Sequence, residues 1–539
     1  MEDLFEWDAH GWAPIHYAAF RGFNRCLEIM ITEVPTLIDF KTNDDQKSTP
    51  LMLAVMSADL QTVKCLLDMG ASVEKLNRLR HGIVELCAFK QYTHILQYLI
   101  DKDYPNLPVW GNLVGLLGSD VNSDVLAAAK CLRVMTRKVK DGVNPSWKPV
   151  CDNGFGEIIV KVLSSEVFDE AKVEALHTTL NIIARDEVKR LLVSHEVIPP
   201  LIKLLQSPNS VIIQLSANVI RAISEIAEFA EMVVASGAIE ALVNALKSVQ
   251  ETPSLVAVVE AIGSIVANKP KFQDLFGNIE GAVEALVARF DGCESRSLLL
   301  ALTQTVARLV TGHSRNQTLF IGAGVGPYLV YLVKVKNRDL MMSTLVAIKA
   351  LAEKNPYAQK ALLADGALAP ILQTLKRSRH TSVQEKTVEA LWAIAGDDSN
   401  ERLEIAESIG VRILVEFVLS PSAILNYIGA DAIGVLSSAP LGLHDAMATV
   451  GGVEALTTLV RKTDREETLL TAVRALRFLC YRTGFVVHKT NQDTLTECEA
   501  VKTLIDLMMN GNKAEVIRAE AAYTLGCIAM CQYHIRLIV

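Results

Sequence analysis

Two glycine-rich stretches contain the residue types that could cradle a phosphate group. Gly322-Ala-Gly-Val-Gly-Pro327 resembles a dinucleotide-binding fingerprint, and Gly154-Phe-Gly156 is a shorter stretch of the same kind. Such a fingerprint functions only after a β-strand, at the start of the helix in a βαβ unit. Both stretches instead lie between apolar runs of helical type. We therefore interpret them as turns between helices and expect no nucleotide and no other cofactor.

The cysteines are the next residues that could do chemistry, as metal ligands or in disulfides. The ten cysteines are scattered along the chain, and no Cys-x-x-Cys pair occurs. Cys527 and Cys531 are four residues apart on one expected helix face, but no second ligand pair accompanies them, as a structural zinc site would require. We predict no metal site, and we interpret the cysteines as buried free thiols in a reducing compartment.

A catalytic apparatus is not indicated by the remaining polar residues. The 11 histidines are dispersed, and neither a Gly-x-Ser-x-Gly elbow nor a His-Glu-x-x-His helix occurs. Dispersal along an extended repeat array places such residues far apart, which disfavours a catalytic triad. We therefore expect no catalytic residues and no enzyme activity.

Charge and hydropathy limit the classes of partner. The formal net charge of −8 argues against a nucleic-acid binder, which would normally present a basic face. No uncharged apolar run approaches the roughly 18 residues of a membrane span, and Met1-Glu-Asp-Leu-Phe-Glu-Trp7 has no signal-peptide character. We expect an intracellular protein, cytoplasmic and/or nuclear, whose partners are other proteins. Its oligomeric state stays open.

The elements that position these residues repeat along the chain. Ser236-Gly-Ala-Ile-Glu-Ala-Leu-Val243 is the clearest copy of a phrase in which a glycine precedes an apolar run. Its glycine place recurs at 154, 196, 237, 281, 324, 366, 410, 452 and 499, in steps of 41 to 47 residues. A period in the low forties is typical of helical solenoid units. We interpret the glycine as a device for a steep bend between two helices, where a side chain would crowd the turn.

The N-terminal residues have a different repeat. Gly11-Trp-Ala-Pro-Ile-His-Tyr-Ala-Ala19 and Ser48-Thr-Pro-Leu-Met-Leu-Ala54 resemble the Thr-Pro-Leu-His-x-Ala run of ankyrin repeats. A degenerate third copy begins at His81-Gly-Ile-Val84. Within that resemblance, His16 is a structural hydrogen-bonding residue between neighbouring repeats, and Pro14 starts a helix.

The units from Val150 onward resemble armadillo repeats, each with two short helices and a long third one. Ile198-Pro-Pro-Leu-Ile-Lys-Leu-Leu205 and the Ser-Pro pair that follows match the family's second helix and loop. The expected third helices cover residues 211–228, 254–267, 296–310, 341–353, 382–395, 425–437, 468–480 and 515–531. An ankyrin block followed by a long armadillo block is similar to the family of ankyrin and armadillo repeat-containing proteins. That resemblance implies a longer protein, of which this chain would be a fragment or a short isoform.

The expected fold is therefore an all-α solenoid, with a short ankyrin block packed on or linked to a right-handed armadillo superhelix. We assign residues 1–105 to about three ankyrin repeats, the third degenerate, and residues 106–149 to an irregular first armadillo-like unit and a loop. Residues 150–539 form the armadillo array of about nine units, and the completeness of the last unit stays open.

The resemblance also implies where a partner would bind. In armadillo proteins the third helices line a concave groove, and an asparagine on many of them clamps the backbone of an extended peptide. The positions that match it here are Ile182, Glu225, Ser264, Arg308, Ala350, Ala393, Val435, Phe478 and Cys527, and none is asparagine. Trp392 resembles a tryptophan of nuclear-import adaptors, but no asparagine accompanies it.

Two polar groups remain as candidate partner-binding residues. Glu225, Ser264 and Arg308 form a polar run on successive third helices that could face the groove. Arg474 and Arg477 lie on one expected third helix within a basic stretch at 461–482, which could accept an acidic peptide. The alternative is that these residues belong to solvated helix faces, with long side chains covering apolar surface.

These observations predict a non-catalytic scaffold or adaptor for protein–protein interactions. Extended or helical peptide segments would bind on the armadillo groove, and the ankyrin surface would supply a second contact. Two alternatives stay open: a cargo or nuclear-transport adaptor, and a regulatory assembly factor of a ubiquitin-linked or cytoskeletal complex. The residues do not identify the partner.

Overall fold

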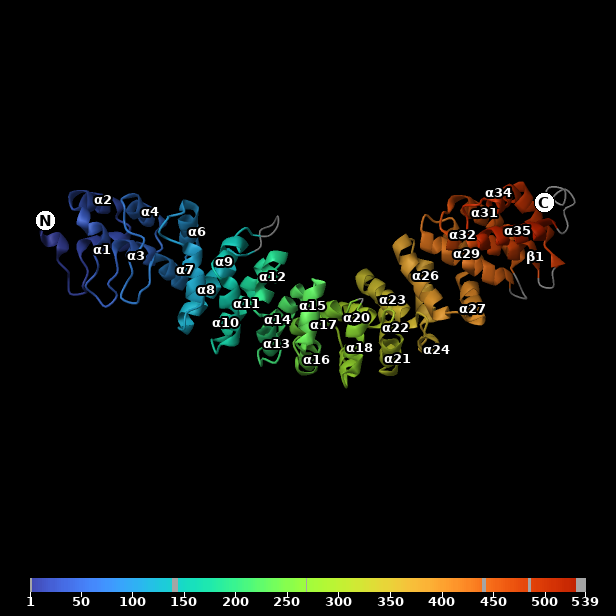
Figure 1. Ribbon diagram of the computed structural model, residues 1–539, viewed down its shortest axis with the longest axis horizontal. Coiled ribbons are helices and arrows are strands. Elements are labelled where there is room, and N and C mark those ends of the chain that lie inside the picture. The colour runs from blue at the N-terminus through green and yellow to red at the C-terminus, as the bar shows by residue number, and fades with distance from the viewer. Residues whose placement is uncertain (1, 138–143, 268, 439–442, 483–485, 530–539) are drawn as a thin grey trace. The chain divides into compact units, whose positions relative to one another are not determined.

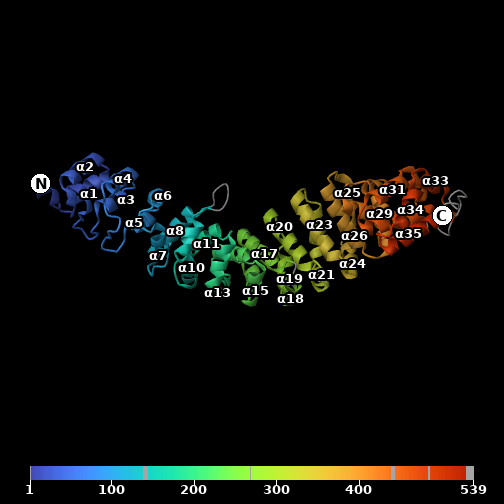
Figure 2. The same cartoon turned by 45° about the horizontal axis from the view of Figure 1, so that its top comes forward.

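The computed structural model describes residues 2–137, 144–267, 269–438, 443–482 and 486–529. The chain divides into two compact units, Met1–Ile265 and Val266–Val539, and each unit is described by itself. Within each unit, helices stack side by side in chain order (Figures 1 and 2). The expected all-α solenoid is confirmed. The predicted domain borders after residues 105 and 149 stay predictions.

The first unit opens with helical hairpins of the ankyrin type. Their elements are η1 (Glu2–Phe5), α1 (Pro14–Arg21), α2 (Asn24–Glu33), η2 (Pro35–Asp39), α3 (Pro50–Met56), α4 (Leu60–Asp68), α5 (Ile83–Lys90) and α6 (Thr93–Lys102). The first helices of successive hairpins pack on one another, α1 on α3 and α3 on α5. Pro14 occupies the first turn of α1, where its missing N–H is not needed.

His16 has the structural role that the ankyrin resemblance implied. Its side chain is fully buried, and its Nδ1 accepts a hydrogen bond from the Ala13 amide at 2.8 Å. The ring therefore carries its proton on Nε2, which donates to the Phe40 carbonyl at 2.7 Å. Phe40 lies in the segment that leads to the second hairpin, so the imidazole connects the start of α1 to that segment.

The rest of the first unit consists of a helix pair followed by helices in threes. The pair is α7 (Val109–Leu117) and α8 (Asn122–Met135). The triplets are α9 (Trp147–Asp152), α10 (Phe155–Ser164) and α11 (Asp169–Ile182); α12 (Asp186–Ser194), α13 (Ile198–Leu204) and α14 (Ser210–Ile223); and α15 (Ala227–Ala235), α16 (Ala238–Ser248) and α17 (Thr252–Val266). The third helices stack, with α8 on α11 and α11 on α14.

The second unit continues the pattern of threes. Its helices are α18 (Pro270–Asn278), α19 (Ala282–Ala288), α20 (Arg296–Val310), α21 (Ser314–Gly322), α22 (Val325–Val333), α23 (Arg338–Ala352), α24 (Pro356–Ala364), α25 (Leu368–Arg377), α26 (Thr381–Ala395), α27 (Ser399–Ile409), α28 (Val411–Val418), α29 (Ala423–Ser438), α30 (His444–Thr449), α31 (Gly452–Lys462), α32 (Glu466–Cys480), α33 (Lys489–Glu497), α34 (Ala500–Met509) and α35 (Glu515–Ala529). A two-residue antiparallel pair, β1 (Tyr481–Arg482) and β2 (Val486–Val487), follows α32.

The third helix expected over residues 211–228 is shorter in the structure. α14 ends at Ile223, and α15 begins at Ala227. At the break, the Ile220 carbonyl accepts hydrogen bonds from both the backbone N–H of Ser224 at 3.0 Å and the Ser224 hydroxyl at 2.8 Å. The pattern of apolar residues runs on across the break, which explains why the sequence indicated one helix.

The recurring glycine place is a left-handed backbone position. Glycine occupies it with φ between 69° and 94° at 154, 237, 281, 324, 366, 410 and 451, and Glu196 and Glu499 adopt φ of 61° and 57°. The predicted place at 452 is corrected to 451, since α31 begins at Gly452. Across Gly237, α15 and α16 meet at 70°.

The physical reason for these glycines differs from the one we expected. An added Cβ at Gly154, Gly324 or Gly366 would meet no atom within 4 Å, so a side chain would not crowd the turn. The left-handed conformation itself disfavours a Cβ, because that atom then lies too close to its own backbone. Glutamate is therefore tolerated at two of the turns, at a conformational cost.

Candidate functional site

Successive third helices are joined by polar contacts between their side chains. A cation on one third helix meets a carboxylate on the next one, 39 to 43 residues later. The ion pairs are Arg133–Glu174 at 2.7 Å, Arg221–Glu260 at 3.9 Å, Lys349–Glu389 at 2.7 Å and Arg477–Glu520 at 2.5 Å. We call this set the inter-repeat ladder. Because these cations and carboxylates pair with each other, they are not available to pair with a ligand.

Arg474 and Arg477, two of the predicted partner-binding residues, belong to the ladder. Both guanidinium groups face Glu520 of α35, with Nε–O distances of 3.5 and 2.5 Å. The Arg477 guanidinium also lies 4.8 Å from the centre of the Tyr523 ring, and the side chain is only 15% exposed. The predicted acidic-peptide site at 461–482 stays a prediction, and a peptide there would compete with Glu520.

The other predicted partner-binding residues, Glu225, Ser264 and Arg308, do not occupy equivalent positions in the fold. Glu225 lies beyond the end of α14 and accepts a hydrogen bond from the buried Lys189 ammonium at 2.6 Å. Ser264 lies two residues before the end of α17, and the exposed Arg308 lies two residues before the end of α20. Counted from the helix end, Arg221 is the residue of α14 that corresponds to them. Arg308 belongs to the other unit, so the continuity of this run stays a prediction.

One cavity interrupts the third-helix face of the second unit. It has a volume of about 430 Å³ and is lined by residues of α23, α24, α26, α27, α29 and α32 and of the segments after α23, after α26 and before α32. The packing of α26 on α29 is less extensive than that of α23 on α26 or of α29 on α32. The cavity, which we call the Trp392 pocket, occupies this wider interval. Sequence reasoning singled out Trp392 but gave no sign of a cavity.

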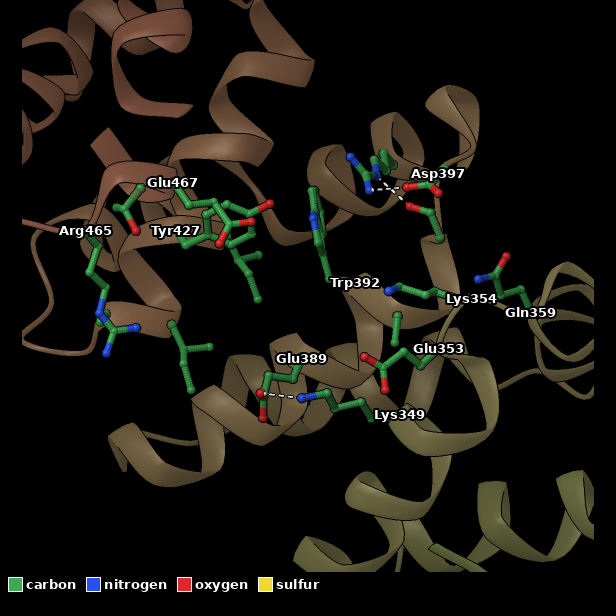
Figure 3. Close-up of a pocket in the computed structure, with 17 residues that line it drawn as sticks. Lys349, Glu353, Lys354, Gln359, Glu389, Trp392, Asp397, Tyr427, Arg465 and Glu467 are labelled. Carbon is green, nitrogen blue, oxygen red and sulfur yellow. Dashed lines mark hydrogen bonds and ion pairs between the residues drawn. The ribbon is translucent and has the colours of Figure 1, made fainter. Parts of the chain in front are cut away.

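The indole of Trp392 is held in place at the centre of the pocket (Figure 3). Its Nε1 donates to the Asp431 carboxylate at 3.0 Å, and the residue is 8% exposed. The Arg402 guanidinium lies 5.7 Å from the ring centre and pairs with Asp431 at 3.3 Å. Ala393, Ile424 and the buried Ile428 complete an apolar floor.

Charged side chains surround this floor in two arrangements. Glu389 accepts hydrogen bonds from Lys349 at 2.7 Å and from Lys386 at 2.8 Å. Burial alone would raise the pKa of Glu389, but the two lysines outweigh burial and lower it, so this carboxylate stays ionised. Lys354 and Arg465 lie on opposite sides of Trp392 (Figure 3), and neither has an ion-pair partner within the described ranges.

Tyr427 supplies a neutral hydroxyl group beside these charges. Burial, together with the carboxylates of Asp431 and Glu467, raises the pKa of Tyr427. The pocket therefore combines an apolar floor and a phenol with two cations, Lys354 and Arg465, that form no ion pair among the described residues. The carboxylates of Glu353, Asp397 and Glu467 also line it. Such a combination suits one apolar side chain of an extended peptide, with acidic groups on either side of it.

The described residues offer little for a metal ion or a membrane. They contain no group of three or more His, Cys, Asp or Glu side chains that could hold a metal ion. Cys527 is buried in α35, and Cys531 lies outside the described residues. No single described helix is long and apolar enough to cross a membrane; one bent pair, α15 with α16, meets the criteria of length and composition.

Comparisons with known proteins identify the N-terminal repeats and the fold. Residues 2–77 match the family model described as ankyrin repeats (3 copies). The chain is similar to the solved structure of an engineered protein, with a TM-score of 0.67 and 24% identity, over 78% of this chain and 98% of that one. This likeness concerns the fold alone.

Curated relatives match part of the chain. The mouse ankyrin and armadillo repeat-containing protein is 30% identical over 159 residues, which are 29% of this chain and 10% of the mouse protein. The human protein of the same name is also 30% identical over 159 residues, 11% of its length. Human transient receptor potential cation channel subfamily A member 1 is 37% identical over 75 residues, 13% of this chain and 6% of the channel. The match thus spans about a tenth of the first two relatives.

Proposed function

We propose that this chain is a non-catalytic scaffold that binds an extended peptide segment of a partner protein at the Trp392 pocket. Its ankyrin repeats and its likeness to repeat proteins support an interaction role in general. The pocket supports the specific site, because it joins an apolar floor to cations that the inter-repeat ladder leaves unpaired.

The pocket favours a particular kind of segment. One aliphatic or aromatic side chain would pack against Ala393 and Ile424, and carboxylates before and after it would meet Lys354 and Arg465. Peptides bound by armadillo proteins are clamped through their backbone by asparagine, whereas here the side-chain pocket would supply most of the affinity. The ankyrin block offers a second surface, and two weak contacts on one chain raise the overall avidity.

The test fills the pocket without removing a structural contact. Ala393 is a partly exposed residue of α26, and A393R would place a long cationic side chain over the apolar floor. A222R is the matched control, since Ala222 is also a partly exposed alanine near the end of a third helix, α14. Wild type and both variants would be compared by proximity labelling in cells.

The expected result is a set of partners that A393R loses and A222R keeps. Retention of every partner by A393R would refute the proposed site. If the lost set consisted of nuclear-import factors, the cargo-adaptor alternative would replace the general scaffold. A partner lost in A393R should also bind the purified wild-type chain and fail to bind purified A393R, which would show that the interaction is direct.

A further inference from the structure

A second cavity in this unit has a different character. It lies between the segment that joins α22 to α23 and the segment that joins α25 to α26, and its volume is about 350 Å³. Four permanently cationic side chains line it, Lys334, Lys336, Arg338 and Arg377, and no Asp or Glu does. We call it the basic cavity.

The cations of the basic cavity are not neutralised by the protein. None of the four forms an ion pair with a described residue, whereas the cations of the inter-repeat ladder pair with the next helix. Lys376 and Arg379 extend the cluster, and all six side chains belong to exposed residues. In a chain with a formal net charge of −8, this is a local reversal of sign. Like charges gathered in one concave place repel each other, and a bound anion relieves that repulsion.

The orientation of one cation also favours an anion at this place. Helices α23 and α26 begin at Arg338 and Thr381, but α22 and α25 end at Val333 and Arg377 beside the same cavity, so the opposite partial charges of the helix ends offset one another and the side chains supply the positive charge. Arg338 links α23 to α26, because its Nη2 donates to the Ser382 hydroxyl at 3.0 Å. A guanidinium group fixed in this way is pre-oriented for a phosphate oxygen.

The residues that line the basic cavity favour a phosphorylated side chain over other anionic ligands. Val333 and Val383 form a base that is only 3% exposed at each residue, so an aliphatic neighbour of the anion would be buried there. His380 supplies the one aromatic ring in the lining, and no Phe, Tyr or Trp lines the cavity, so it lacks the row of aromatic side chains of a single-stranded nucleic-acid site. A membrane site would need apolar side chains that project from the surface, whereas these valines are recessed. The size is at the low end of the roughly 300–1,000 Å³ of ligand pockets, which suits one small group.

We propose that the basic cavity binds a phosphorylated side chain of a partner protein, next to an apolar residue of that partner. The proposal rests on the scaffold function proposed above and adds a requirement for partner phosphorylation. It names a site separate from the Trp392 pocket, because the two cavities share no lining residue.

The experiment measures fluorescence anisotropy with a labelled acidic peptide that carries one phosphoserine followed by leucine. The same peptide without phosphate, inositol-lipid vesicles and a single-stranded oligoribonucleotide serve as competing probes. The test variant is K336E/R377E. The matched control is R315E/K360E, which changes the charge equally at exposed residues of the same unit that line neither cavity. Far-UV circular dichroism establishes that both variants are folded.

The phosphopeptide is expected to bind wild type and R315E/K360E at least about tenfold more tightly than K336E/R377E, and more tightly than the unphosphorylated peptide. Equal binding of the two peptides, equal loss in both double variants, or a preference for vesicles or RNA would overturn the proposal. A393R separates the two hypotheses. Phosphopeptide binding that survives in A393R supports the basic cavity even if the Trp392 pocket fails, and partner loss in A393R supports the pocket even if the phosphopeptide does not bind.

Discussion

Glu389 is the residue at which the inter-repeat ladder borders the Trp392 pocket, and its replacement by glutamine tests how the ladder stabilises the fold. The Glu389 side chain is 11% exposed, and each of its two lysine partners is 36% exposed. E389Q preserves shape and one acceptor oxygen but removes the charge. A charge-assisted hydrogen bond contributes about 1.5–3 kcal/mol when buried, and an exposed ion pair about 0.2–1 kcal/mol.

Both lysines are more than one-third exposed, so solvent screens their interaction with Glu389. Each of the two lysine contacts is therefore assigned about 1 kcal/mol, between the value of an exposed ion pair and that of a buried charge-assisted hydrogen bond. The Lys349 contact joins α23 to α26, whereas Lys386 lies on α26 itself. E389Q should then destabilise α26 and its packing on α23 by about 2 kcal/mol in total, which corresponds to roughly a 30-fold rise in local opening. Hydrogen exchange of the amides of α23 and α26 measures this directly. E385Q is the control, since Glu385 lies on the same helix and has no ion-pair partner within the described residues.

The pH dependence gives an independent check. The folded-state pKa of Glu389 lies below its usual value of 4.5, so its contribution is fully present above about pH 5 and is lost as pH falls through the folded pKa. The difference between wild type and E389Q should therefore shrink as the solution becomes more acidic than pH 4.5. An E389Q effect equal to that of E385Q, or one that persists undiminished at low pH, would refute the reasoning.

Three further predictions concern other parts of the chain. E196G should stabilise the protein by about 0.5–1 kcal/mol and G366A should destabilise it by about 1 kcal/mol, because both positions have φ above 60°; denaturant midpoints would show opposite shifts. Burial lowers the pKa of His16 below 6.5, so the folded state resists protonation, and α1 should lose hydrogen-exchange protection as pH falls below about 6.5 but not above it. Burial raises the pKa of Cys131 to about 12, so a thiol reagent at pH 8 should modify the exposed Cys26 quickly and Cys131 only after unfolding.

Local requirements of the backbone could be predicted from the sequence alone. Pro14 and the glycine places mark where a helix begins or where the chain takes a left-handed turn, and these preferences depend on a residue and its immediate neighbours. The same register correctly included Glu196 and Glu499, whose side chains alone indicate no turn. The place predicted at 452 was wrong by one residue, and the reason assigned to the turn was wrong, because steric room around a glycine is a property of the packed structure.

The pairing of charges was decided by the tertiary structure. The repeat period indicates which third helices are neighbours, but whether Arg477 meets Glu520 or a ligand depends on the rotation and spacing of two helices 43 residues apart. The same holds for the Trp392 pocket, which exists because α26 and α29 pack less closely than their neighbours. The basic cavity likewise brings together Lys334 and Arg377, which are 43 residues apart and belong to different repeats.

The sequence by itself thus determined the solenoid, its period, its turns and the absence of an asparagine ladder at the aligned positions, since each of these follows from residue type and spacing along the chain. The tertiary structure decided which charges are neutralised and which remain for a partner, because that depends on distances of a few ångströms between side chains of different repeats. Electrostatic and packing energies change steeply over such distances, and a repeat period does not specify them.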